Sequence, residues 1–287
     1  MIITRKTAEV ELARDETLTY QPIERDAFSP SAALAVETVR RVEHLTDRLF
    51  SFSISRPPGF RFRSGEFVMV GLPNDGRPLL RAYSIASPGY SDELEFLSVK
   101  IEDGPLTSRL RHIRVGDPVY LGKKPTGTLV TDALLPGRRL FLLSTGTGIA
   151  PFMSLARDPD VYSRFAEIVL VHSVRNVADL AYRELLETQL AGDPLVRDEA
   201  LLQFHYLPTV TREAFRTQGR IARLIEDGRL FERVGGPARF VPDTDRVMLC
   251  GSMAMIKDHA RDLEQRGFVE GSNSQPGQFV IERAFVG

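Results

Sequence analysis

The spacing of hydrophobic and polar residues changes partway along the chain, and the change predicts two kinds of structure. In the first half, short apolar runs are separated by turn signals such as Pro57-Pro58-Gly59 and Asn74-Asp75-Gly76. We expect strands at residues 35–43, 49–55, 66–72, 79–86, 94–101 and 118–121. Short strands divided by turns favour a small antiparallel β-barrel.

Beyond residue 136 the pattern becomes a strand followed by a helix, repeated several times. We expect strands at 139–144, 167–173, 201–207 and 246–250, helices at 149–156, 178–190, 221–225 and 254–265, and a closing strand at 278–281. Strands that alternate with helices indicate a parallel sheet covered by helices. The predicted fold is two-domain: an N-terminal antiparallel β-barrel at 34–135, then an α/β parallel-sheet domain at 136–287. Residues 1–33 show no sustained period and are predicted to be a loosely ordered extension.

Composition narrows the function classes. The formal net charge is -1, whereas a nucleic-acid-binding protein needs a clear basic excess to neutralise phosphates. Cys250 is the only cysteine, so the chain by itself forms no disulfide and no cysteine-ligated zinc or iron–sulfur site. No apolar run approaches the roughly 18 residues of a membrane span. We expect a soluble cytoplasmic protein that binds no metal, nucleic acid or membrane.

The strongest chemical signal is the run RAYSIASP at 81–88. Side chains alternate along a strand, so Arg81 and Tyr83 share one face and Ser84 supplies a hydroxyl beside them. A flavin needs an aromatic or apolar surface for its ring, a polar group near N5, and cations for its phosphates. The run therefore predicts a flavin site. A strand with a half-exposed tyrosine and a surface arginine is the alternative.

A second run, GPLTSRL at 104–110, predicts a glycine-proline turn that opens a helix. Such a turn presents backbone N–H groups around Gly104 and Leu106, together with the hydroxyl of Thr107, to a phosphate. An ordinary capped helix is the alternative.

The run GTGIAP at 146–151 follows an apolar strand and opens a helix, which is the context that a dinucleotide-binding turn requires. Thr147 and Gly148 lie in this turn. Pro151 replaces the usual third glycine, and proline fits the first turn of a helix because the N–H there has no partner within the helix.

The strand expected at 246–250 ends in Cys250 and Gly251, and ligands bind at the carboxyl ends of strands in open α/β sheets. The Cys250 thiol is placed either near a nicotinamide or in an inert core, where free cysteines are common. Three arginines bear on the choice of cofactor. Arg175 follows a strand at the point where an acidic residue would select NAD, and Arg212 and Arg220 follow the next strand. Together they suit the 2′-phosphate of NADP, with solvated surface arginines as the alternative.

As a set, these runs resemble a known family. RAYSIASP, GPLTSRL, GTGIAPF, TREAFRTQGRI, CGSMAMIKD and the C-terminal VIERAFVG are similar, in the same order, to motifs of the ferredoxin/flavodoxin–NADP(H) reductases of the bacterial plant-type branch. The resemblance covers residues 36–287 and implies an FAD-binding barrel followed by an NADP(H)-binding α/β domain.

The resemblance also implies site residues. The FAD would be held by Arg81, Tyr83, Ser84, Val99, Lys100, Gly104, Leu106, Thr107, Ala284 and Phe285. The NADP(H) would be held by Thr147, Gly148, Pro151, Arg175, Arg212, Arg220, Cys250 and Gly251. The catalytic residues, near the hydride path, would be Ser84, Cys250 and Ala284.

The implied activity is that of a monomeric, FAD-dependent reductase with noncovalent FAD and with NADP(H) as a substrate. It would pass electrons between NADPH and a one-electron carrier, ferredoxin or flavodoxin, through the flavin semiquinone. We expect an acidic carrier to meet cations of the barrel, drawn from Arg56, Arg61, Arg63, Arg109, Arg111, Arg114, Lys123 and Lys124. The alternatives are a free-flavin reductase, a reductase that serves an oxygenase through a separate carrier, and a noncatalytic redox sensor.

Overall fold

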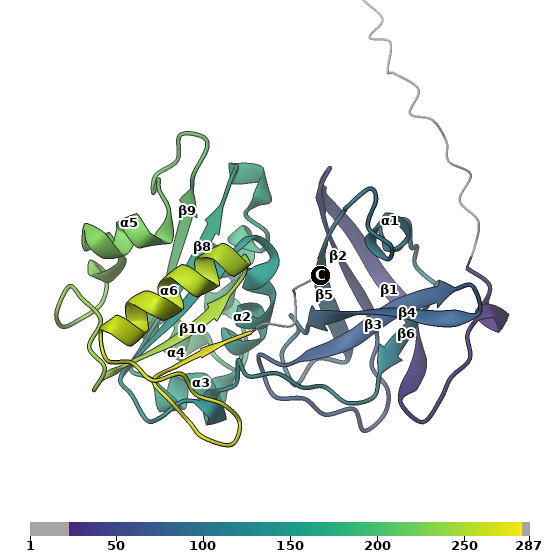
Figure 1. Cartoon of the computed structure of the whole chain (residues 1–287), viewed down its shortest axis with the longest axis horizontal. Helices are drawn as coiled ribbons and strands as arrows, with labels where there is room; N and C mark the ends of the chain where they lie inside the picture. The colour runs from purple at the N-terminus through teal and green to yellow at the C-terminus, as the bar shows by residue number, and fades with distance from the viewer. Residues whose placement is uncertain (1–22, 283–287) are drawn as a thin grey trace, which may run out of the picture.

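The computed structural model describes residues 23–282 of the chain. The predicted flavin contacts Ala284 and Phe285 and residues 1–22 of the predicted extension lie outside this range. Within it, the chain forms two lobes, each built around one sheet (Figure 1). None of the helices in the described range is long and apolar enough to cross a membrane.

Six strands form the sheet of the first lobe, which we call the barrel lobe. They are β1 (Leu34–Thr46), β2 (Leu49–Ser55), β3 (Phe67–Asn74), β4 (Arg77–Ser84), β5 (Glu93–Val99) and β6 (Pro118–Gly122). Their order is β4-β3-β6-β1-β2-β5, and every neighbouring pair is antiparallel. The short helix α1 (Thr107–Leu110) lies between β5 and β6 in the chain. The antiparallel N-terminal sheet is confirmed.

Aromatic side chains fill the interior of the barrel lobe. Phe50 and Phe52 of β2 are fully buried, and the Phe52 and Phe96 rings lie 5.3 Å apart between centroids. Phe28 precedes the first strand, yet its ring packs 4.6 Å from that of Tyr120. The described end of the predicted extension is therefore attached to the barrel lobe.

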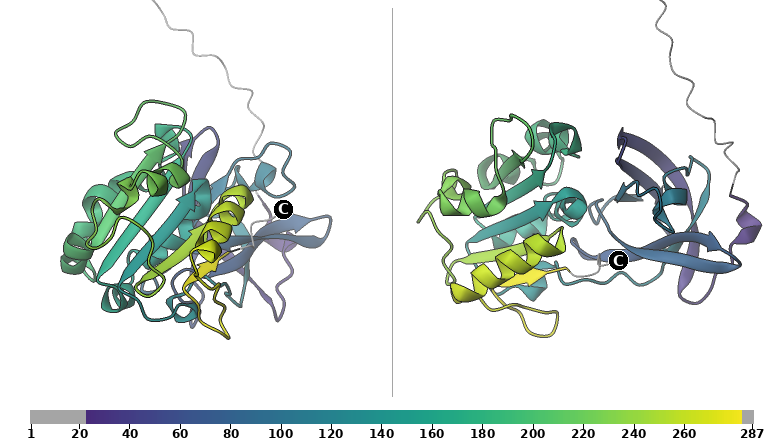
Figure 2. Two further views of the ribbon diagram at one scale, coloured as in Figure 1. Left: turned by 60° about the vertical axis from the view of Figure 1, so that its left-hand side comes forward. Right: turned by 45° about the horizontal axis from the view of Figure 1, so that its top comes forward.

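Five strands form the sheet of the second lobe, which we call the α/β lobe. They are β7 (Arg139–Thr145), β8 (Glu167–Val174), β9 (Phe204–Val210), β10 (Asp245–Cys250) and β11 (Phe279–Ile281), in the order β11-β10-β7-β8-β9. All neighbouring pairs are parallel, as predicted. The covering α-helices are α2 (Ala150–Leu155), α3 (Pro159–Arg164), α4 (Arg197–Gln203), α5 (Ile221–Glu226) and α6 (Met253–Gln265). Figure 2 shows these helices on both faces of the sheet.

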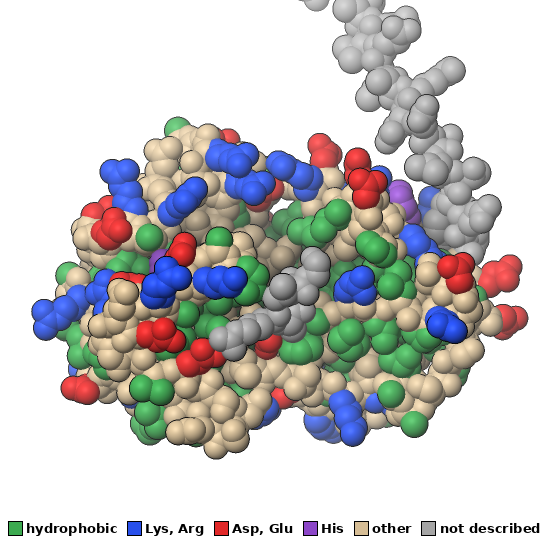
Figure 3. Space-filling model, viewed as in Figure 1, with side chains coloured by type: hydrophobic (Ala, Val, Ile, Leu, Met, Phe, Trp, Pro, Cys, Tyr) green, Lys and Arg blue, Asp and Glu red, His purple; other side chains and the backbone are tan. Residues whose placement is uncertain are grey.

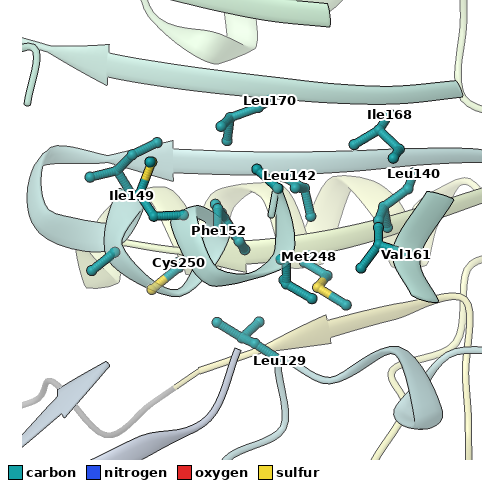
Figure 4. Packing of buried hydrophobic residues seen from close by; sticks show 14 of the residues in the cluster. Leu129, Leu140, Leu142, Ile149, Phe152, Val161, Ile168, Leu170, Met248 and Cys250 are labelled. Atoms are coloured by element: carbon teal, nitrogen blue, oxygen red, sulfur yellow. The ribbon is translucent and has the colours of Figure 1, made fainter. Parts of the chain in front are cut away.

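Successive residues of β7 point to opposite faces of this sheet and so belong to two hydrophobic clusters. Phe141 and Leu143 pack in the cluster covered by α5 and α6, whereas Leu140 and Leu142 pack in the cluster covered by α2, α3 and α4. The second cluster extends past Leu129 toward the other lobe (Figure 4). It includes residues of the barrel lobe, namely Leu49, Ala86 and Leu97. The two lobes therefore share one buried core at their boundary.

One predicted element is wrong, and another begins later than expected. The helix expected at 178–190 is replaced by the 3₁₀-helix η4 (Val177–Asp179) and, further on, by the π-helical turn η5 (Leu185–Gln189). Between them Tyr182 has a φ of +60°, which an α-helix does not accommodate. The strand expected from residue 201 begins only at Phe204, because Leu201 and Leu202 belong to α4 and are 65% and 81% exposed.

Candidate functional site

Tyr83 is next to last in β4, and its ring is held on several sides. The side chain is 7% exposed and meets the rings of Phe52 and Phe96 edge-on, at centroid distances of 6.0 and 6.2 Å. Its hydroxyl lies 3.1 Å from Oγ of Ser98 in β5. Burial raises the pKa of the phenol, so the group is neutral at physiological pH. Tyr83 is therefore a rigid, uncharged aromatic surface at the end of the strand.

Ser84 ends β4 with a buried hydroxyl that has no hydrogen-bond partner among residues 23–282. A buried polar group without a partner costs about 1–3 kcal/mol, which a ligand atom at the site would recover. On the same strand Arg81 is exposed, and its Nη1 donates to the Leu80 carbonyl at 2.8 Å. One strand thus brings together an aromatic ring, an unsatisfied hydroxyl and an exposed cation.

The chain after β5 adds an apolar surface to this strand end. Val99 is 37% exposed and Ile101 is 54% exposed, which is high for branched apolar side chains. Between them, Nζ of Lys100 donates to the carbonyl of Thr46 at 2.6 Å, and burial lowers the pKa of its ammonium group. The Lys100 ammonium is therefore held at the β1–β2 turn.

The turn before α1 is as tight as its sequence suggested. A Cβ on Gly104 would lie 2.2 Å from Oγ1 of Thr107, so a larger residue would displace the threonine hydroxyl. The Thr107 hydroxyl donates to the carbonyl of Ile101 at 3.2 Å, and Leu106 is buried in the barrel core. We call Arg81, Tyr83 and Ser84 the β4 set. Together with the turn before α1, the β4 set fits an FAD: it offers a ring surface, an unsatisfied hydroxyl and a cation next to a tight turn.

The glycine turn at 146–151 is in direct contact with the end of β10. A Cβ on Gly148 would lie 2.3 Å from the carbonyl oxygen of Cys250, and one on Gly251 would lie 2.1 Å from Oγ1 of Thr145. The same Thr145 hydroxyl accepts a hydrogen bond from the backbone N–H of Ser252 at 2.9 Å. Two predicted site elements, 104 residues apart in the chain at Gly148 and Ser252, thus pack backbone against backbone at the carboxyl edge of the sheet.

The turn itself keeps the predicted order of residues. Thr147 is partly exposed in the 3₁₀-helix η3 (Gly146–Ile149), and Pro151 is buried in the first turn of α2. Gly146 has a φ of +55°, a conformation in which glycine is favoured. The backbone around Thr147 is therefore accessible to a ligand.

His172 is a buried residue that the sequence analysis did not single out. Its Nε2 lies 3.1 Å from the carbonyl oxygen of Gly146, and its Nδ1 lies 3.4 Å from the hydroxyl of Tyr206. Burial lowers the pKa of the imidazole to about 4, so the ring is neutral at physiological pH. A neutral ring that donates from Nε2 holds the first glycine of the turn. The strand pattern gave no sign of this, because a histidine within an apolar run also fits a core.

Cys250 is fully buried at the end of β10 and packs in the cluster shared by the two lobes (Figure 4). Burial, followed by the charge of Glu282, raises the pKa of its thiol, so the group is not a thiolate. Glu282 itself is 7% exposed, and its Oε2 accepts from the backbone N–H of Thr128 at 3.1 Å. This buried carboxylate was missed by the sequence analysis, although it directly follows the predicted closing strand.

The three predicted arginines belong to the α/β lobe: Arg175 follows β8, and Arg212 and Arg220 lie between β9 and α5. Figure 3 shows several Lys and Arg side chains on the upper part of this lobe. The backbone N–H of Arg212 donates to the carbonyl of Arg175 at 3.0 Å, so these two residues are neighbours. Arg220 is the N-cap residue of α5. All three are exposed.

A set of contacts anchors the loop that carries Arg212. The Phe215 ring lies 5.1 Å from the guanidinium carbon of Arg183 and 5.5 Å from that of Arg216. Glu187 binds both cations: its Oε1 accepts from Nε of Arg183 at 3.0 Å and also from Nη2 of Arg216. We call these four residues the Glu187 clamp. The sequence spacing did not indicate this clamp, because Arg183 and Glu187 precede β9 whereas Phe215 and Arg216 follow it.

Comparisons with known proteins agree with this division. Residues 34–130 match the family of oxidoreductase FAD-binding domains, and residues 142–261 match the family of oxidoreductase NAD-binding domains. These two ranges contain the β4 set and the glycine turn, respectively.

The chain is similar over most of its length to curated reductases. It is 52% identical over 266 residues to a flavodoxin/ferredoxin–NADP reductase of Rhodobacter capsulatus, covering 92% of this chain and 98% of the relative. It is 50% identical over 254 residues to a ferredoxin–NADP reductase of Azotobacter vinelandii, covering 88% and 98%. A ferredoxin NADP+ reductase from Neisseria gonorrhoeae, solved with bound FAD and NADP, superposes with a TM-score of 0.79 at 31% identity, covering 89% of this chain and 100% of that one.

Proposed function

Because this chain belongs to the ferredoxin–NADP reductase family, we propose that it carries electrons between NADPH and a ferredoxin or a flavodoxin through a bound FAD. The sequence predictions of the family, of the two-domain fold and of the cofactor pair FAD and NADP(H) are confirmed. The residues that hold the cofactors, the carrier and the one-electron steps belong to the proposal.

One observation supports the proposal most directly. The strand with the unsatisfied Ser84 hydroxyl and the helix after the glycine turn meet at the lobe boundary, where Nη2 of Arg157 donates to the carbonyl of Ala86 at 2.6 Å. A flavin on the strand and a nicotinamide on the turn would therefore face each other across one boundary. Hydride transfer requires that contact.

The chain's own residues would bind and orient the two cofactors. FAD supplies the chemistry that links a two-electron hydride to single electrons. Tyr83 would present a neutral ring to the flavin, the Ser84 hydroxyl would bond it, and Arg81 would meet the phosphates. Cys250, a neutral thiol, adds bulk without charge beside the path. Ala284 and Phe285 remain predictions for the tail.

Three arginines would select NADPH over NADH. A charge-assisted hydrogen bond contributes roughly 1.5–3 kcal/mol, so the loss of Arg212 or Arg220 removes about tenfold or more of the affinity for a 2′-phosphate. NADH has no such phosphate. Steady-state kinetics of Arg212→Ala and Arg220→Ala with both cofactors test this, and an equal loss for NADH and NADPH would mean that the arginines are structural.

The central test is electron transfer to a protein carrier. We expect the purified chain to be yellow with one noncovalent FAD per molecule, to be reduced by NADPH, and to pass electrons to ferredoxin or flavodoxin. A free-flavin reductase would release FAD during purification, and a redox sensor would show no turnover. Failure to bind added FAD would overturn the proposal.

A further inference from the structure

One polar contact ties the helix after the glycine turn to the strand that carries Ser84. Arg157 follows α2, and its side chain is only 13% exposed. Its Nη2 donates to the carbonyl of Ala86 at 2.6 Å, while its Nε donates to the carbonyl of Met153 at 3.1 Å in its own helix. The guanidinium is therefore fixed at both ends, with one lobe on each side.

A carboxylate of the barrel lobe completes the contact. Oε2 of Glu95 lies 3.9 Å from Nη2 of Arg157, and Oε1 accepts from Nη2 of Arg41 at 2.9 Å. The Glu95 backbone is bonded to the same strand end, since its carbonyl accepts from the N–H of Ala86 at 2.8 Å and its N–H donates to Oγ of Ser87 at 3.1 Å. Glu95 is thus held in place by its own lobe before it meets Arg157.

A second segment of the α/β lobe reaches the same carboxylate. Tyr182 lies near enough to Glu95 for that charge, after burial, to raise the pKa of its phenol, although the buried hydroxyl makes no hydrogen bond among the described residues. Its φ of +60° is unusual for a bulky residue and is retained only where the surroundings impose it. The boundary therefore contains a built polar cluster, whereas a hydrophobic contact alone would not fix the orientation of the lobes.

We propose that Arg157 is the positioning residue that sets the spacing between the nicotinamide turn and the flavin strand. The inference rests on the proposed function, which places the two cofactors on these elements. The six residues of α2 span about 9 Å, with the glycine turn at one end and Arg157 just past the other. Ala86 lies two residues beyond Ser84. The bond from Arg157 therefore fixes the carboxyl end of α2 relative to the Ser84 hydroxyl that is proposed to bond the flavin.

Cys250 gives a direct measurement of lobe separation that needs no cofactor chemistry. It is the only thiol in the chain and is fully buried in the core shared by the two lobes. A thiol reagent reaches it when the lobes part or when the chain unfolds. Labelling rates in the full-length protein with its flavin bound, measured alongside global stability in denaturant, separate the two routes.

The test variants are Arg157→Gln and Arg157→Lys, with Arg138→Gln as the matched control. Arg138 is 68% exposed and pairs with Glu167 inside the α/β lobe, so its loss leaves the boundary intact. We expect Arg157→Gln to raise the Cys250 labelling rate by about tenfold or more, as the loss of a charged hydrogen bond predicts. Arg157→Lys keeps the charge and should fall between. If Arg157→Gln folds poorly, Glu95→Gln removes the partner from the other side and should raise labelling as well.

Kinetics supply the second readout. Among the described residues Arg157 bonds to Met153, Ala86 and Glu95, and not to the arginines proposed for the 2′-phosphate, so the KM for NADPH and the affinity for 2′,5′-ADP should stay within about twofold of wild type. The rate of flavin reduction at saturating NADPH should fall by about tenfold. If Arg157 had only a structural role, its loss would lower stability without slowing flavin reduction at an unchanged KM for NADPH.

The outcomes separate the two claims. Labelling of Arg157→Gln at the wild-type rate, or a rise that merely follows lost global stability, would overturn the role of Arg157. A chain that binds FAD but fails to oxidise NADPH would overturn the proposed function, while the labelling comparison would still measure the boundary.

Discussion

At the scale of single residues, two buried polar side chains are in opposite states. The Ser84 hydroxyl has no partner among residues 23–282, whereas both ring nitrogens of His172 lie near polar atoms. The first state suits a group that awaits a ligand, and the second suits a group that supports the backbone. Each leads to a different measurable effect on stability.

Replacement of Ser84 by alanine should stabilise the flavin-free protein. The variant Ser84→Ala removes a buried group that lacks a partner, so the apoprotein gains about 1 kcal/mol or more, while the holoprotein loses a bond to the flavin. Thermal unfolding of both forms checks that Ser84→Ala raises the Tm of the apoprotein and lowers the Tm of the holoprotein. Ser154→Ala is the control, because that hydroxyl is also buried without a partner in the described chain but lies in α2, so both forms should gain alike.

Acid should weaken the fold partly through His172. The folded pKa is lowered to about 4 from 6.5, so between these values the unfolded chain binds more protons. Stability therefore falls as pH drops from 6.5 to 4, by about 3 kcal/mol from this group. His172→Gln keeps a donor but does not titrate, and denaturant unfolding should show a shallower loss across that window. A slope that stays the same as in the wild-type protein would contradict the assignment.

At the scale of elements, the loop from β9 to α5 carries arginines that the sequence predicted, but it is held by contacts that the sequence did not predict. The motif placed Arg212 and Arg220 correctly after β9, but the Glu187 clamp joins this loop to η5, a segment that the sequence analysis took for an ordinary helix. The clamp holds the loop at Phe215, between the two arginines that would meet the phosphate.

Glu187→Gln and Arg216→Gln should both weaken the binding of 2′,5′-ADP, by about threefold each, as expected for partly exposed ion pairs. A long-range charge effect predicts the opposite for Glu187→Gln, since the loss of a negative charge would favour a phosphate. Calorimetric titration distinguishes the two signs. Binding of 5′-AMP should not change, and Glu184→Gln, an exposed neighbour, should resemble wild type.

Strands and glycine turns were predictable because they follow local rules of period and backbone geometry. Gly148 and Gly251 illustrate this, since a Cβ at either position would lie within 2.3 Å of a neighbouring oxygen atom. Arg157, His172 and Glu282 were not predictable in the same way. Their roles depend on partners 71, 26 and 154 residues away, and only the folded arrangement brings those partners together.

At the scale of the whole molecule, the chain is nearly neutral, and the cations of its barrel lobe differ in whether they are bonded internally or exposed to solvent. Of the barrel residues expected to meet an acidic carrier, Arg56 is engaged internally: it donates to the carbonyls of Phe60, Gly89 and Ser91 at 2.7–2.8 Å. Lys124, in contrast, is exposed. The surface that binds the carrier should therefore depend on exposed cations such as Lys124, and not on internally bonded ones such as Arg56.

Reduction of the carrier should slow as salt rises. Between about 0.01 and about 0.15 M ionic strength the Debye length falls from roughly 30 to roughly 8 Å, so steering of an acidic partner weakens. We expect kcat/KM for the carrier to fall by about tenfold, while the rate of flavin reduction at saturating NADPH stays constant. Lys124→Gln should flatten the salt dependence, and Arg56→Gln should lower stability yet keep that dependence. A salt-independent carrier reaction would exclude electrostatic docking.

The burial of Cys250 bears on how such an enzyme survives its own side reactions. Reduced flavins also react with dioxygen and release peroxide, and peroxide attacks thiolates rather than thiols. The raised pKa of Cys250 and its place in the shared core keep the only sulfhydryl of the chain protonated and enclosed. Sulfenic acid and mixed disulfides with glutathione would then form only in molecules whose lobes have parted or whose chain has unfolded, so at constant global stability the rate of oxidation of Cys250 would measure how often the boundary opens.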